Sequence, residues 1–344
     1  MKSNRISGIV ACTGAVIGAG FASGREVVAF FSRYHGHAIW LIALSSATAT
    51  GLCGLCVRRA SRLQTSHWCE LYAKAPVWMR WGAFGCAALL LAVTGGAMIS
   101  AAGHMIALLW PNEWAYPIGA VGTLYMAWRL SFGSVRPLAG LSGALAAVFV
   151  AVTALLLASS RPLTVDMAPR PDMGTLLWAS ARAVAYAAMN LTLAIGVVCR
   201  CGQENARGDW QVAGGLGAVL GALLTLSALL YAKRPELQSE AFPIVKLMSR
   251  FGRPGFIVSA TMLYLAVLTS LVAVLCALRG IAELRVESRA LHAAAALGAP
   301  LAVSCVGFEG IVDGLYAPAG FACLILVFGP LIWLEKRGER KVDS

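Results

Sequence analysis

Four glycines and a charged pair fall within one apolar stretch near the start of the chain. The stretch reads GAVIGAGFASGREVVAFF, its glycines are Gly14, Gly18, Gly20 and Gly24, and Arg25 and Glu26 follow them. Each glycine costs a helix about 1 kcal/mol relative to alanine, so four together favour an interrupted helix. Ionisable groups at membrane depth are expensive and mark functional sites. The pattern therefore predicts a broken membrane helix with charges at the break.

A second interpretation of the same glycines stays open. Gly14 with Gly18, and Gly20 with Gly24, keep the four-residue spacing of small residues that pack two membrane helices closely. Packing alone does not explain why Arg25 and Glu26 follow. In hydrocarbon, unwound backbone persists only where it lines a cavity or is buried in protein, so an interruption would mark a solute path.

The composition indicates that this stretch belongs to a protein of membrane helices. Of the 344 residues, 59% are hydrophobic and 13% are charged, and the mean hydropathy is +0.73. A soluble domain carries about 25% charged residues, so the solvent expected here is a lipid bilayer. The net charge of +12 comes from Lys and Arg that flank apolar runs, which is typical of positive-inside topology and not of nucleic-acid binding.

About ten runs are long enough, or nearly so, to cross a bilayer as helices. They cover residues 5–31, 37–57, 81–110, 116–130, 138–158, 175–199, 211–232, 255–280, 290–307 and 315–335. The bias of Lys and Arg puts both termini in the cytoplasm, in the cell (inner or plasma) membrane. The loop after the seventh run is amphipathic over 240–251 and predicts a short helix on the outer face.

The string Gly18-Ala19-Gly20-Phe21-Ala22-Ser23-Gly24-Arg25-Glu26, at the start of about ten spans, resembles the YkvI-type membrane proteins. That family is placed in the amino acid-polyamine-organocation superfamily with the LeuT-type fold. The resemblance implies an all-α membrane protein built from two inverted five-helix repeats, 1–160 and 161–344. It also implies that spans one and six are broken.

The resemblance implies a site for a small solute, an amino acid or similar compound, at the two breaks. Its residues are Gly18, Ala19, Gly20 and Ser23 from span one, with Tyr186 and Asn190 from span six. Freed amides at a half-helix end would suit a carboxylate.

A sodium site is implied by Ala266, Thr269 and Ser270, which match the Ala-x-x-Thr-Ser pattern of sodium-coupled relatives. The carbonyls of Gly14 and Ile17 would complete it, giving the all-oxygen cage that hard cations prefer. The alternative is that both hydroxyls bond back to the preceding turn. Span five contains no lysine, which some proton-coupled relatives place at the sodium position, and this favours sodium over the proton.

An outer gate is also implied, with Arg25 facing Asp313 or Glu309 and Glu26 beside it. The expected function is secondary active transport by alternating access, with no cofactor beyond the possible Na⁺, and the oligomeric state stays open. The alternatives are a proton-coupled carrier, a channel, or an intramembrane serine protease using Ser23 and His104. The protease is disfavoured because Phe21 stands where such enzymes carry glycine, so we do not expect an enzyme.

Overall fold

The computed structural model describes residues 8–9, 12–16, 18–132, 135–158, 172–204, 210–232, 234–283 and 289–340. Within these ranges the regular elements are all helical, which lets the backbone satisfy its own hydrogen bonds in hydrocarbon. The main helices are α2 (Ala19–Ser23), α3 (Arg25–Phe30), α4 (Ala38–Leu63), α5 (Val77–Leu109), α6 (Ala115–Leu130), α7 (Val135–Ala158), α8 (Met173–Glu204), α9 (Trp210–Ala232), α10 (Pro243–Met248), α11 (Gly252–Glu283), α12 (Arg289–Ser304), α13 (Phe308–Gly310), α14 (Tyr316–Cys323) and α15 (Gly329–Arg340).

The expected spans each have a helical counterpart. Helices α2 and α3 belong to span one, α4 to α9 are spans two to seven, α11 and α12 are spans eight and nine, and α13 to α15 are span ten. Six helical segments of the described chain are long and apolar enough to cross a membrane: Ser32–Leu63, Val77–Leu109, Met173–Glu204, Trp210–Ala232, Pro243–Arg279 and Phe308–Arg337. The protein is therefore a multi-pass membrane protein.

Helices α6 and α12 are the short members of the set. Each has 16 residues, which gives about 24 Å of helix against about 30 Å of hydrocarbon. Arg129 lies in the last turn of α6, where a basic side chain favours the helix terminus. Length and composition thus identify six candidate spans among the described residues.

Span six differs from the expectation. Helix α8 runs without interruption for 32 residues, so the expected break at Tyr186 to Asn190 is wrong. The physical reason lies in the sequence, because the centre of α8 is rich in alanine, the strongest helix former, and has no glycine or proline.

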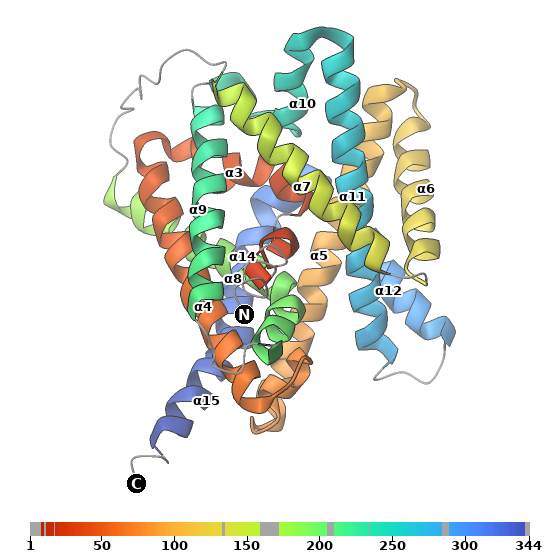
Figure 1. Cartoon of the computed structure of the whole chain (residues 1–344). Helices are drawn as coiled ribbons and strands as arrows, with labels where there is room; N and C mark the ends of the chain where they lie inside the picture. The colour runs from red at the N-terminus through yellow and green to blue at the C-terminus, as the bar shows by residue number, and fades with distance from the viewer. Residues whose placement is uncertain are drawn as a thin grey trace.

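The packing forms two groups of helices around span one. Helix α4 packs against α8 and α9, and α5 packs against α6, α11 and α12, as Figure 1 shows. The short helices of span one lie between these groups, because α3 contacts α8 and α9 while α2 contacts α11. The amphipathic loop forms α10, as predicted, and α10 packs against α11 and α2 at the end of the molecule opposite α15.

Candidate functional site

Span one is interrupted first at Gly18. Residues 12–16 are helical, whereas Gly18 has an extended backbone (φ −88°, ψ −176°) and α2 begins at Ala19. The Gly18 amide donates to the Val16 carbonyl at 2.9 Å, and the Gly18 carbonyl accepts from the Ala22 amide at 3.1 Å. An extended residue cannot continue the ladder of bonds from residue i to i−4, so the glycine-rich pattern correctly predicted a break here.

The second interruption is at Gly24, between α2 and α3. Gly24 has φ of +83°, which L side chains rarely adopt, and the Tyr231 ring covers the place where a Cβ would stand. The Ser23 hydroxyl braces the turn, since it donates to the Gly20 carbonyl at 2.7 Å and accepts from the Arg25 amide at 3.1 Å. This hydroxyl is used within span one itself.

The turn at Gly24 directs Arg25 towards the loop before α10 and towards span ten. Its guanidinium pairs with the Asp313 carboxylate at 2.5 Å and donates to the carbonyls of Gln238 at 2.9 Å and Glu240 at 3.1 Å. Arg25 is 5% exposed, so a charge that is costly to bury meets one full charge and two carbonyl dipoles. The contact joins span one, the loop before α10 and a π-helical turn of span ten, and such turns are frequent at functional sites.

Of the other expected gate residues, Glu309 is exposed and lies apart from this contact. Arg33, which the sequence did not single out, reaches the other Asp313 oxygen at 3.6 Å. Glu26 points elsewhere. Of the two acidic residues expected to face Arg25, Asp313 is therefore the one that pairs with it.

Glu26 turns back over α2. Its carboxylate lies so close to Gly20 that a Cβ on that glycine would collide with it. The Tyr186 hydroxyl donates to Glu26 Oε2 at 3.3 Å, and Glu26 is 6% exposed. The close approach explains why position 20 needs a glycine, and it brings a buried carboxylate to the first turn of α2.

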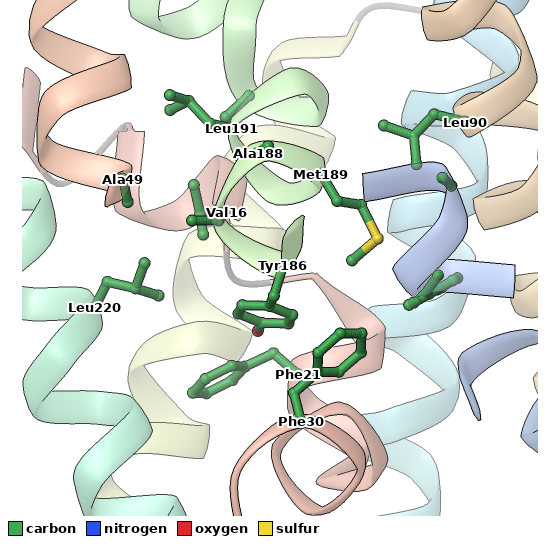
Figure 2. Close-up of a cluster of buried hydrophobic side chains, with 14 of the residues drawn as sticks. Val16, Phe21, Phe30, Ala49, Leu90, Tyr186, Ala188, Met189, Leu191 and Leu220 are labelled. Atoms are coloured by element: carbon green, nitrogen blue, oxygen red, sulfur yellow. The ribbon is translucent and has the colours of Figure 1, made fainter. Parts of the chain in front are cut away.

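Span six supplies an aromatic and polar face to this region. The Tyr186 ring packs against Phe30 with centroids 5.0 Å apart, and Figure 2 shows Phe21 and Phe30 next to it. Asn190 is buried and donates from Nδ2 to the Tyr186 carbonyl at 3.0 Å, as a side chain on a continuous helix can. Arg182, one turn before Tyr186, is 9% exposed and lies over the Phe30 ring at 5.0 Å.

Span eight, which carries three of the expected sodium ligands, lies beside the first break of span one. Helix α11 packs against α2, and the Ser270 hydroxyl lies 3.9 Å from where a Cβ of Gly18 would be. The Thr269 hydroxyl donates to the Ala266 carbonyl at 3.1 Å, which is the back-bonding alternative. Gly14 lies in the helical segment before the break, and Ile17 lies outside the described residues.

Ser23 and His104, the residues of the alternative serine protease, bond to other partners and not to each other. His104 bonds through Nδ1 to the Ser100 carbonyl at 3.0 Å and stacks edge-on against Tyr116, while Ser23 bonds within span one. Among the described residues no three His, Cys, Asp or Glu side chains gather where a metal ion could be held.

Comparisons with known proteins bear on the fold. No family model matches the chain, and no curated protein matches it. Among solved structures, it resembles a manganese transporter of Eremococcus coleocola in complex with an aromatic bis-isothiourea substituted compound. The TM-score is 0.51 with 14% sequence identity, over 98% of this chain and 72% of that chain. The fold of this chain is similar to the fold of that transporter. At this identity the likeness concerns architecture alone.

Proposed function

We propose that the protein is a secondary active transporter that moves a small solute, an amino acid or a similar compound, by alternating access. The observation that carries this proposal is the double interruption of span one at Gly18 and Gly24, covered on its outer side by the contact of Arg25 with Asp313. Irregular backbone at membrane depth is tolerated where it lines a path, and discontinuous helices are where such carriers bind solutes.

The packing of helices supports two inverted repeats, 1–160 and 161–344, as in the LeuT-type fold of the proposed YkvI-type relatives. Replacing each span by the one five places away turns one packed pair into another. The pair α5 and α6 corresponds to α11 and α12, α5 with α12 to α11 with α6, and α5 with α14 to α11 with α7. The pairs α4 with α9 and α5 with α11 correspond to themselves. Five spans per repeat reverse the second repeat in the membrane, which is the symmetry on which alternating access depends.

The proposed solute site follows the first break. The proposed binding segment is Gly18, Ala19 and Gly20, where amides at the start of a short helix would take the solute carboxylate, although the Gly18 amide itself donates to Val16 here. Tyr186 of span six reaches Glu26 of span one, Asn190 lies one turn further along α8, and Ser23 stabilises the turn at Gly24.

The proposed coupling ion is sodium, held by oxygens of Gly14, Ile17, Ala266, Thr269 and Ser270. The approach of Ser270 to Gly18 supports this set, since it brings span eight to the break. A cage of neutral oxygens can replace the hydration shell of a hard cation without a carboxylate. Binding of the ion couples to transport only if its affinity differs between the two states.

Proton coupling is the second candidate, and a specific observation favours it. Glu26 is a buried, protonatable group within the interrupted span, where its carboxylate has one hydrogen bond from Tyr186. Groups of this kind serve as proton relays in membrane carriers.

Uptake into proteoliposomes tests the proposal. We expect the purified protein to accumulate a labelled amino acid when an inward sodium gradient is imposed, and much less with an equal potassium gradient. Uptake that follows an inward proton gradient and ignores sodium would favour the second candidate. Failure to accumulate any amino acid under either gradient would reject amino acid transport. Both termini are proposed to be cytoplasmic in the cell membrane, which labelling of a cysteine introduced at Ser344 tests.

A further inference from the structure

The carboxylate of Glu26 is the least compensated charge in the described part of span one. Its neighbour Arg25 points away to Asp313, so the two adjacent charges do not pair. The Tyr186 hydroxyl on α8 donates to Glu26, and the buried Tyr316 on α14 is likewise an uncharged side-chain type. No cation reaches this carboxylate among the residues that the structure describes.

A buried carboxylate of this kind needs a counter-charge. One hydrogen bond of 3.3 Å does not replace the hydration that a carboxylate loses on burial. Arg25 is taken by Asp313, and the described residues supply no other positive charge to Glu26, so a bound cation or a proton would supply it.

The surroundings favour an organic cation. Tyr186, whose hydroxyl donates to the carboxylate, packs against the rings of Phe30 at 5.0 Å and Phe31 at 5.2 Å, so the residue that contacts Glu26 belongs to a cluster of aromatic side chains. A carboxylate beside aromatic rings is the chemistry that recognises an ammonium group, because ring faces attract cations. The Phe30 ring already carries one such contact, with the guanidinium of Arg182 at 5.0 Å.

We propose that Glu26, with Tyr186 beside it, binds the ammonium group of the transported solute. The inference deepens the proposed function and rests on it. The carboxylate of Glu26 lies at Gly20, between the two interruptions of span one. A solute with an ammonium group would meet a full opposite charge there, whereas a simple carboxylic acid would be repelled by Glu26.

The closeness of Glu26 to Gly20 also gives the site its selectivity for charge. An anion placed beside the Glu26 carboxylate would bring two like charges together in a medium of low dielectric constant, where repulsion is strong. Affinity should therefore depend on the amine of the solute more than on its carboxylate.

Three probes of similar size separate these features: L-alanine has both charges, ethylamine lacks the carboxylate and propionate lacks the amine. Their binding to the full-length protein in detergent is measured by the shift of its melting temperature at increasing probe concentration. We expect alanine and ethylamine to stabilise the wild type and propionate to have no effect. Stabilisation by propionate without ethylamine, or by none of the three, would overturn the assignment.

The deciding variant is Glu26→Gln, which keeps the shape and the Tyr186 hydrogen bond but removes the charge. We expect its half-saturating alanine concentration to rise about 10- to 100-fold, the range for losing a hydrogen bond to a charged group. Glu113→Gln removes one negative charge from an exposed loop and should leave alanine binding unchanged. If Glu26→Gln does not fold, Glu26→Asp decides: it keeps the charge with a shorter reach, so wild-type affinity would overturn the proposal.

Two further outcomes assign the cation differently. If sodium chloride alone stabilises the wild type more than potassium chloride, and Glu26→Gln abolishes this difference while retaining alanine affinity, then Glu26 binds the coupling ion. If alanine affinity is retained but proton-driven uptake is lost, Glu26 carries protons. Either result overturns the ammonium site but is compatible with the proposed function of the protein as a transporter. Alanine binding that depends on Glu26 without uptake into proteoliposomes would instead reject transport and keep the site.

Discussion

Substitution of Gly24 by alanine is the sharpest test of the interrupted first span. The residue joins α2 to α3 with φ of +83°, and a left-handed backbone costs an L residue about 1 to 2 kcal/mol. The new Cβ would stand 2.5 Å from the Tyr231 hydroxyl oxygen and 2.6 Å from the adjacent ring carbon, so the ring must move. Overpacking of this kind costs about 1 to 3 kcal/mol, and the expected total is about 2 to 5 kcal/mol.

Thermal unfolding of the purified protein measures this cost. A loss of that size should lower the melting temperature by roughly 4 to 10 °C, using about 2 °C per kcal/mol. The matched control is Gly51→Ala, because Gly51 lies within α4 and a Cβ there meets no atom within 4 Å. Alanine at that position should be neutral or slightly stabilising.

A double-mutant cycle separates the two causes. In a Tyr231→Ala background the collision is gone, so Gly24→Ala should cost only the backbone strain of about 1 to 2 kcal/mol. The reasoning fails if Gly24→Ala melts like Gly51→Ala, because the left-handed turn between the two short helices would then not exist in solution.

Three further predictions concern transport. Asp313→Asn should reduce uptake at least about tenfold, because it leaves the buried Arg25 without its acidic partner. Exchanging Arg25 and Asp313 should recover part of the rate. If the exchanged protein takes up no more solute than Asp313→Asn, the pair is not a working gate. Replacing Thr269 and Ser270 by alanine should raise the sodium concentration for half-maximal uptake by about one to several orders of magnitude, since each ligand lost leaves buried carbonyls short of a partner; unchanged sodium dependence contradicts the proposed ion site. Tyr186→Phe should weaken alanine binding by about two- to tenfold, the range for one hydrogen bond. The melting temperature measured at increasing alanine concentration checks this, and unchanged alanine binding contradicts it.

The interruption of span one could be read from the sequence because its cause is local. Glycine at 18 weakens the helix and glycine at 24 permits left-handed backbone, and no tertiary contact is needed to see this. The pairing of Arg25 with Asp313 came from the resemblance to a family, and the structure contains that contact. The amphipathic run before span eight also predicted α10, and this prediction needed no knowledge of tertiary contacts.

Other features depend on contacts that no local pattern shows. Glu26 was grouped with Arg25 as a gate residue because the two are adjacent, yet the turn at Gly24 sends one side chain outward and the other over Gly20. The break in span six was inferred by analogy, and the alanine-rich centre of α8 prevailed over it. Burial of Arg182 against Phe30 depends on how α3 meets α8, which the spacing of residues does not determine.

Two close pairs of cysteine thiols make the protein sensitive to oxidation. Cys12 and Cys201 have sulfur atoms 3.6 Å apart, Cys86 and Cys323 have theirs 3.7 Å apart, and all are free thiols. Each pair has one member in either proposed repeat, so oxidation would convert a contact between halves that must rearrange into a covalent tie. A mild oxidant should therefore arrest the transport cycle without unfolding the protein, and a thiol reductant should restart it. The proposed transport would then depend on the reducing power of the surroundings.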